Sequence, residues 1–370
     1  MAAPAPGGGT ATSVTVSGTA CAPGWRAPAS GSSVFTVDNV SAATAYEVDL
    51  VGANRVSVYG YIEMLAPGTE DAMDVVLPPG QYSFACTALS GPSLQSQVER
   101  VSGPAVSGAH PWVPVNANQI AAATVDYRAS LTLWMHRLAS ATDALESAVK
   151  SGQLAHARQL WLPAHLDYER LGATPGTFGT FSAQIDGTPL GLQGGVGSPY
   201  FAGFLRLEYG LWSGQSASEL VPIVEALDQA VHALVTQFPQ ILLPPNDLAQ
   251  DTQAILEGTL QLEMTGETDE GSHTDLATAW ADVEATEMAL SAVAPLLTQN
   301  APALLAQLQQ GLSSMATAFQ SYQGAKGWAT LQSLTTAQRE SLDGQLGGLL
   351  EELSAVPGLL EPIQPATSSS

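Results

Sequence analysis

Residues 203–212 read Gly-Phe-Leu-Arg-Leu-Glu-Tyr-Gly-Leu-Trp, an apolar stretch with one carboxylate, Glu208. If the stretch is a helix, Leu205 and Glu208 lie three residues apart on the same face. A histidine in the first of two such positions would let both side chains reach a single cation. Because Leu205 takes that position, the stretch predicts a helix on which only Glu208 of such a pair remains.

Helical periodicity continues through most of the chain beyond residue 105. Apolar residues recur there at three- and four-residue spacing, and glycine and proline are sparse within the periodic stretches. The stretches that we predict to be helices are 143–150, 220–237, 247–264, 276–299, 303–322 and 336–353. Together they predict an all-α helical bundle over residues 115–360, followed by a disordered tail at 361–370.

The N-terminal region follows a different pattern. Short apolar runs with alternating polar residues lie at 13–16, 33–37, 45–51, 55–63 and 82–89, and Pro and Gly turn signals separate them. Strands of this length and spacing predict a β-sandwich of about 90 residues, which we place at 13–104. Residues 105–114 would be a linker, and residues 1–12 a flexible leader that lacks the basic start of a signal peptide. The predicted fold class is therefore multidomain, a β-sandwich followed by a helical bundle.

The charge of the chain limits its partners. It has 34 acidic and 11 basic residues, for a formal net charge of −23. Such a chain is repelled by nucleic acid and by anionic membrane surfaces and attracts cations, although the same charge also serves solubility. No run of 18 apolar residues occurs, so we expect neither nucleic-acid binding nor direct membrane insertion.

Several blocks of the helical region resemble the imelysin-like family, peptidase family M75. The 203–212 stretch is similar to its Gly-x-His-x-x-Glu signature, with Leu205 in place of the histidine. Further blocks occur in the family's order at 161–172, 184–187, 255–257, 262–266 and 272–276. Because independent blocks in one order are hard to obtain by chance, the chain is identified as a member of this family over residues 115–360.

The resemblance and the helical spacing give a set of candidate metal ligands in the bundle. His165 and Glu169 are four residues apart and share a helix face. The full candidate set is Glu208, Glu169, Asp186, His165, His273 and Glu257. Ligands that are mostly carboxylates suit iron and other hard cations better than zinc. We expect Arg170 and Arg206 to pair with buried carboxylates and keep them ionised.

Each of these candidates also has a purely structural interpretation. Glu208 could be a core carboxylate paired with Arg206, and His165 could be a packing or capping residue. His273 precedes a predicted helix start, where Thr274 or Asp275 would serve as the N-cap. These alternatives stay open at the level of sequence.

The N-terminal region resembles the cupredoxin-like domain of the same family of iron-uptake proteins. The match includes Cys21, Glu47 and Cys86, and the resemblance implies a copper or iron site on these three residues. A blue-copper centre needs two histidines as well as a cysteine, yet no histidine precedes His110. Copper is therefore a doubtful cofactor, and iron is the candidate metal of the protein as a whole.

The two cysteines have three possible states. In an oxidising compartment they would form a disulfide that closes a loop of about 65 residues, worth roughly 4 kcal/mol. Metal-binding thiolates and free thiols are the alternatives. We predict the Cys21–Cys86 disulfide and no type 1 copper in this domain.

The resemblance implies an iron-binding component of an uptake system, exported to the periplasm or the extracellular space. Such a protein would present iron to a membrane permease and work with a haem peroxidase of the same system. The alternative is that loss of the histidine at Leu205 left an interaction or structural module without metal. No H-E-x-x-H, G-x-S-x-G or strand-associated G-x-G-x-x-G motif occurs, so we do not expect an enzyme.

Overall fold

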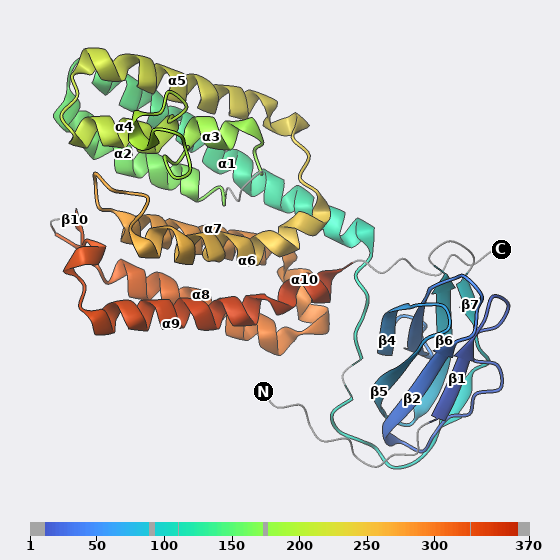
Figure 1. Ribbon diagram of the computed structural model, residues 1–370. Coiled ribbons are helices and arrows are strands. Elements are labelled where there is room, and N and C mark those ends of the chain that lie inside the picture. The colour runs from blue at the N-terminus through green and yellow to red at the C-terminus, as the bar shows by residue number, and fades with distance from the viewer. Residues whose placement is uncertain (1–11, 89–92, 110, 173–176, 326, 362–370) are drawn as a thin grey trace. The chain divides into compact units, whose positions relative to one another are not determined.

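The computed structural model describes residues 12–88, 93–109, 111–172, 177–325 and 327–361. Internal contacts divide this chain into a β unit that ends at Ala117 and a helical unit over Asn118–Glu361 (Figure 1). The predicted fold class, a β-sandwich followed by a helical bundle, is therefore confirmed. The predicted leader and tail fall, apart from residues 12 and 361, outside the described residues.

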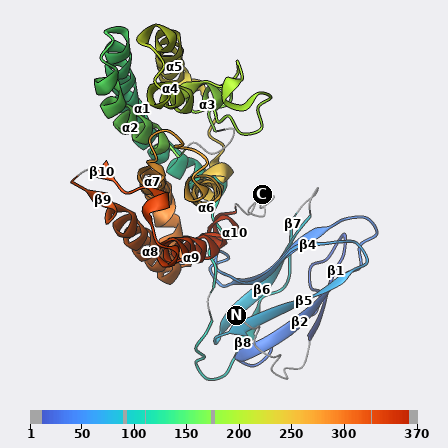
Figure 2. The same cartoon turned by 60° about the vertical axis from the view of Figure 1, so that its left-hand side comes forward.

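The β unit consists of two sheets (Figure 2). One sheet has the strand order β1 (Thr12–Val16), β2 (Gly31–Asn39), β5 (Glu70–Leu77), with β1 parallel to β2. The other has the order β4 (Val58–Leu65), β3 (Tyr46–Gly52), β6 (Gly80–Ala88), β7 (Ser93–Gln95), and β8 (Glu99–Val101) also pairs with β6. The five runs of alternating residues in the sequence thus correspond to β1, β2, β3, β4 and β6, and β5 was not predicted.

Aromatic side chains and the disulfide fill the space between the sheets. Phe35, Phe84 and Trp25 make edge-to-face contacts with centroid distances of 5.0 to 6.1 Å. Cys21 and Cys86 form a disulfide within the same core, with their Cα atoms 5.7 Å apart. Alternate residues of β3 point into this core, and the residues between them face the other way.

The helical unit contains ten α-helices among its described residues. They are α1 (Ala117–Lys150), α2 (Leu154–Glu169), α3 (Thr180–Ile185), α4 (Gly203–Trp212), α5 (Ala217–Gln237), α6 (Pro245–Gln261), α7 (Asp275–Asn300), α8 (Pro302–Gln320), α9 (Thr336–Leu353) and α10 (Ala355–Leu360). The stretch 203–212 is α4 from end to end. The helix predicted at 143–150 is only the last part of α1, whose buried face extends back to Ile120.

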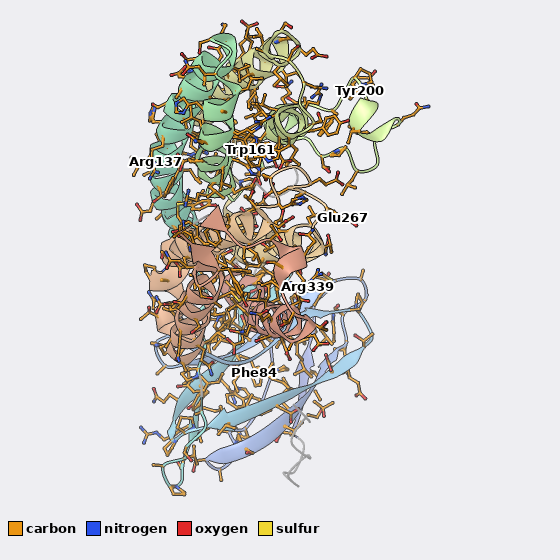
Figure 3. The ribbon with its side chains drawn as sticks, turned by 90° about the vertical axis from the view of Figure 1, so that its left-hand side faces the viewer. Phe84, Arg137, Trp161, Tyr200, Glu267 and Arg339 are labelled. Carbon is orange, nitrogen blue, oxygen red and sulfur yellow. A yellow bond between two sulfur atoms is a disulfide. The ribbon has the colours of Figure 1, made fainter. Side chains whose placement is uncertain are left out.

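The helices lie in two groups (Figure 1). Helices α1 to α5 form one group, and α6 to α10 form the other. Helix α2 packs on α4 within its own group and on α7 of the other. Figure 3 shows Trp161 of α2 inside the bundle and Tyr200 on a loop that projects from it. Side chains on the inner face of α2 can therefore meet residues from both groups.

Candidate metal centre

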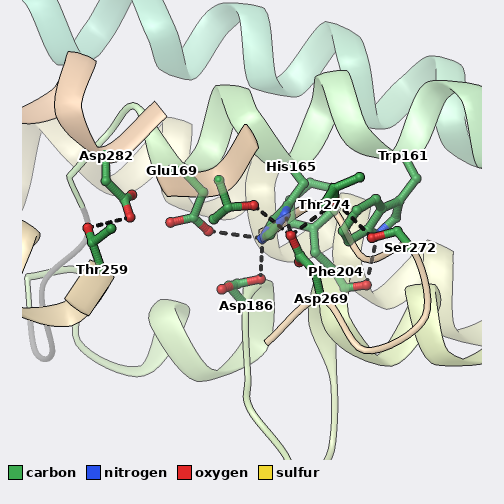
Figure 4. A network of polar contacts seen from close by, with 11 residues as sticks. Trp161, His165, Glu169, Asp186, Phe204, Thr259, Asp269, Ser272, Thr274 and Asp282 are labelled. Atoms are coloured by element: carbon green, nitrogen blue, oxygen red, sulfur yellow. Dashed lines mark hydrogen bonds and ion pairs between the residues drawn. The ribbon is translucent and has the colours of Figure 1, made fainter. Parts of the chain in front are cut away.

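His165 is enclosed by carboxylates and aromatic rings (Figure 4). Its side chain is 1% exposed, and its Nε2 atom lies 2.9 Å from Oε1 of Glu169 and 3.0 Å from Oδ1 of Asp186. Trp161 and Phe204 pack beside the imidazole, with centroid distances of 4.7 and 5.4 Å. The indole Nε1 of Trp161 donates a hydrogen bond to the carbonyl oxygen of Phe204. The imidazole is thus fixed with one nitrogen between two carboxylates.

Asp186 reaches His165 because the end of α3 is tied to the start of α4. Asp186 and Gly203 form an antiparallel bridge, and residues 187–202 loop out between them. Gly203 has a φ of +83°, and a Cβ at this position would collide with the carbonyl group of Ile185. Only glycine tolerates both conditions. The first residue of the 203–212 stretch therefore helps to position a candidate ligand that precedes it.

Asp269 faces the other side of the imidazole. It is fully buried between η3 (Glu263–Thr265) and α7. Its Oδ2 atom accepts hydrogen bonds from the hydroxyl groups of Thr274 at 3.0 Å and Thr278 at 2.7 Å. Its Oδ1 atom lies 3.8 Å from Nδ1 of His165, and neither of these two atoms has a hydrogen-bond partner among the described residues. Asp269 was not among the ligands predicted from the sequence.

Glu208 of α4 is also buried, at 2% exposure. Its Oε1 atom accepts a hydrogen bond of 2.7 Å from the backbone N–H of Ser272. Burial and the charge of Asp269 raise its pKa to about 7, despite the hydrogen bonds from Ser272 and the nearby His165. Leu205, one turn earlier, is buried as well.

Arg206 does not pair with Glu208, contrary to one of our expectations. Its Nη1 atom donates to Oε1 of Gln215 at 3.1 Å, and its guanidinium lies over the ring of Tyr209. Residues two positions apart on a helix point in different directions. Glu208 therefore faces the interior while Arg206 faces the segment after α4.

Two further buried acids extend the cluster, and neither was predicted from the sequence. Asp282 of α7 accepts a hydrogen bond of 2.8 Å from the hydroxyl of Thr259. Burial and the neighbouring Glu169 raise the pKa of Asp282 well above its ordinary value. Burial, Asp282 and Glu169 do the same for Glu263. The acidic cluster thus continues past Glu169 to the second helix group.

The cluster holds more negative charge than its single imidazole can balance. Burial and the charge of Asp186 raise the pKa of Glu169 to about 7, although His165 acts in the opposite direction. Burial alone would lower the pKa of His165, but Asp186 and Glu169 outweigh it and the pKa is raised well above the usual value. Burial and Asp269 also raise the pKa of Asp275 to about 7. Without a cation, the cluster therefore retains protons.

These donors fit a hard or borderline metal ion. One ligand atom from each of His165, Glu169 and Asp186 lies within 4.8 Å of the others. Two donors at right angles around an ion, with bonds of about 2.1 Å, lie about 3.0 Å apart. The contacts of His165 Nε2 with both carboxylates have this length. On the opposite side of the imidazole from Glu169 and Asp186, Nδ1 of His165 and Oδ1 of Asp269 also lack hydrogen-bond partners among the described residues.

Two of the predicted ligands lie outside this cluster. His273 is exposed and has a φ of +56°, and its backbone N–H donates to the carbonyl oxygen of Asp269. His273 therefore takes part in the backbone turn that follows Asp269, and its imidazole faces solvent. Glu257 accepts a hydrogen bond from Gln253 on its own helix, α6. The structure brings His165, Glu169, Asp186 and Glu208 together and leaves these two apart.

Arg170 pairs with acidic residues beside the metal centre and not with the carboxylates of the centre itself. Its Nε atom lies 2.7 Å from Oε2 of Glu284, and its Nη1 atom lies 3.2 Å from Oδ1 of Asp167. Its guanidinium also lies 5.1 Å from the ring centroids of Trp134 and Trp280. The expected pairing with a buried carboxylate holds for Asp167. That residue faces away from His165, as neighbours on a helix do not share a face.

The site implied for the β unit is not assembled. Cys21 and Cys86 form a disulfide, so neither thiolate is available to a metal. In the register between β3 and β6, Val48 lies opposite Cys86, and Glu47 lies opposite Thr87. Successive residues of a strand point to opposite faces of the sheet. Glu47 is therefore on the outer face, away from the cysteines in the core.

Comparison with known proteins places the chain in a family. The family model for imelysin, peptidase M75, matches residues 123–356. The chain belongs to the imelysin family. This imelysin is 27% identical to the iron uptake system component EfeO of Yersinia pseudotuberculosis over 347 residues, which are 94% of this chain and 90% of that protein. It is also 27% identical to EfeO of Escherichia coli K12 over 349 residues, again 94% and 90% of the two chains.

A solved structure of an iron-regulated protein A precursor from Parabacteroides distasonis is a more distant match. It shares 12% identity and a TM-score of 0.43 with this imelysin, over 70% of this chain and 98% of that chain. Among the described residues, no helix combines the length and apolar character that crossing a membrane requires.

Proposed function

We propose that this imelysin is the iron-binding component of an iron uptake system and that iron binds at His165, Glu169 and Asp186. The names of its relatives support the biological role. The observation that carries the proposal is the position of His165 Nε2, 2.9 and 3.0 Å from two carboxylate oxygens in a buried, strongly acidic cluster. Iron here is cargo rather than a catalytic cofactor, and the proposed role includes no enzymatic step.

His165 compensates for Leu205 in this proposal. The family signature has a histidine where this chain has Leu205, so α4 supplies only Glu208 to the site. His165 supplies an imidazole nitrogen from α2 instead, and its contact with Trp161 keeps it in place. A site with one imidazole and several carboxylates suits iron better than copper(I), which prefers sulfur ligands.

Iron and protons compete for the same donors. The carboxyl groups of Glu169 and Glu208 have pKa values raised to about 7 by burial and by neighbouring acids. Each must lose its proton to bind a metal ion, so binding releases protons and weakens as the pH falls. The acidic surroundings would therefore hold iron at neutral pH and release it on acidification.

The proposed setting is the periplasm or the extracellular space. The Cys21–Cys86 disulfide supports this, because disulfides persist in oxidising compartments. There the protein would present iron to a membrane permease and act with a haem peroxidase of the same system, as the family resemblance implies.

Calorimetric titration of the metal-free full chain with Fe(II), Fe(III) and Zn(II) tests the proposal. We expect saturable iron binding that is lost in Glu169→Gln and in Asp186→Asn. Glu351→Gln is the matched control, because Glu351 is an exposed acid on α9. Binding that is unchanged in both site variants, or absent from the native chain, would favour the alternative that replacement of the family histidine by Leu205 left an interaction module without metal.

A further inference from the structure

A second group of metal-ligating side chains lies between α1 and α5, and none of its members belongs to the proposed iron centre (Figure 2). Asp228 and His232 are four residues apart on α5, so they share one face of that helix. Asp143 approaches His232 from α1, with its Oδ1 atom 3.0 Å from the imidazole Nε2. One ligand atom from each of the three side chains lies within 4.8 Å of the others.

The spacing of these three atoms suits one four-coordinate ion. Four ligands around Zn²⁺, with bonds of about 2.0 Å, form a tetrahedron with edges of about 3.3 Å. From Nε2 of His232, the Oδ1 atoms of Asp143 and Asp228 lie at 3.0 and 3.8 Å, on either side of that length. The side chains of His232 and Asp143 are 48% and 60% exposed, so an ion can enter from solvent and water can fill the fourth position.

Asp228 directs an oxygen without another partner at this group. Its side chain is 13% exposed, and its Oδ1 atom is buried and has no hydrogen-bond partner among the described residues. The 3.8 Å between this oxygen and Nε2 of His232 is too long for a hydrogen bond. Burying a carboxylate oxygen without a donor is costly, and an ion bound between the two atoms would remove that cost.

The charges of the group are not balanced from its own side chains. Lys150 lies on the same seam between α1 and α5, but its Nζ atom pairs with Glu225 at 2.7 Å and with Glu146 at 3.2 Å. A proton on His232, whose pKa is raised by its hydrogen bond with Asp143, would balance one of the two aspartates. A divalent ion would balance both.

We propose that His232, Asp143 and Asp228 bind a borderline divalent cation of the Zn²⁺ class between α1 and α5. One imidazole nitrogen with two carboxylate oxygens suits Zn²⁺, Co²⁺ or Ni²⁺, whereas Ca²⁺ and Mg²⁺ prefer oxygen atoms alone. The ion would link two helices of the first group. The site does not rest on the proposed iron centre, because the two have no residue in common.

Calorimetric titration of the full chain with Zn(II) tests this site. The Glu169→Gln variant serves as the background, because it weakens the iron centre, and any Zn(II) that still binds there is the same in every variant compared. We expect saturable Zn(II) binding in this background. An excess of Mg²⁺ should leave the affinity for Zn(II) unchanged, since Mg²⁺ prefers sites made of oxygen atoms.

The variants His232→Gln and Asp143→Asn, made in the background, each remove one ligand. We expect each to weaken Zn(II) binding by about tenfold or more, because loss of a group that only supports a ligand already costs about 10–100-fold. The matched controls are His136→Gln and Asp126→Asn, which change exposed residues of the same types on α1. Both controls should bind Zn(II) like the background.

Three results would overturn the proposal. The first is no saturable Zn(II) binding in the background. The second is equal affinity in the background, His232→Gln and Asp143→Asn, which would leave the three side chains as an ion-paired group without metal. The third is an equal loss in the controls, which would mean that Zn(II) follows any surface imidazole or net charge. If one of the two ligand variants fails to fold, the other decides.

Discussion

The two units bury carboxylates in opposite ways. In the helical unit, Asp269 accepts hydrogen bonds from two threonines and faces His165, and Glu208 accepts one from a backbone N–H. In the β unit, Glu47 and Asp49 each keep a buried oxygen without any such donor. Donors that surround a carboxylate fix its direction and lower the cost of its charge. The helical cluster is therefore more rigid and better preorganised than the β pair.

Removing the disulfide should have the largest effect on stability, and this effect should be confined to the β unit. The pair Cys21→Ala and Cys86→Ala opens the loop between them, which costs the β unit about 4 kcal/mol of unfolding free energy. Iron binding by the helical unit should not change. Differential scanning calorimetry of the full chain would show the β transition at lower temperature. An equal fall in both transitions would contradict the division into two independent units.

Replacing His165 tests what the imidazole adds to the carboxylates. In His165→Gln we expect iron affinity to fall by about 3 kcal/mol, since one metal bond is lost and the neighbouring acids repel one another more. His156→Gln, an exposed residue of the same helix, is the control. Isothermal titration of both variants measures the difference. If the two variants bind iron equally well, His165 is only a packing residue.

Leu205→His restores the signature of the family. A second imidazole one turn before Glu208 should strengthen Zn(II) and Fe(II) binding by about 1–3 kcal/mol if the geometry is retained. Fe(III) should gain less, because it prefers oxygen donors. Calorimetry with the three ions would decide. Unchanged affinity for all of them would place the ion away from α4.

The acid clusters should make the metal-free protein less stable as the pH rises. Glu169 and Glu208 have pKa values raised to about 7, and Asp49 has one raised to about 8 by burial and by Glu47. The folded chain thus binds more protons than the unfolded chain between pH about 4 and about 8. For each extra proton that the folded chain binds, the free energy of unfolding falls by about 1.4 kcal/mol for every unit by which the pH rises in this window. The raised pKa of His165 has the same sign.

Thermal melts of chelated protein at pH 5 and pH 8 check this expectation. The melting temperature should be lower at pH 8, and iron should raise it there by binding the ionised cluster. Glu169→Gln should show a smaller pH effect on the helical transition, and Asp49→Asn on the β transition. A higher melting temperature at pH 8 without metal would show that the carboxylates are already ionised in the folded protein.

The local sequence pattern predicted the helices and strands better than it predicted which residues contact one another in the folded protein. The alternating runs correspond to strands and 203–212 to α4, because period and turn residues act over a few positions. The long α1 was predicted only at 143–150, and Asp269, Glu263 and Asp282 were missed. A lone acid next to threonines looks in sequence like an ordinary polar segment. Nothing local distinguishes it from a buried ligand.

The sequence by itself determined the two units, the family and one helical turn of the site, His165 with Glu169. These follow from spacing along the chain, which the geometry of a helix or strand turns directly into a shared face. Only the tertiary structure decided that Asp186, 21 residues away, reaches the same nitrogen, and that His273 and Glu257 do not join it. It also put Glu47 on the face opposite the cysteines. Contacts between distant residues depend on how helices and strands pack, which no local period encodes.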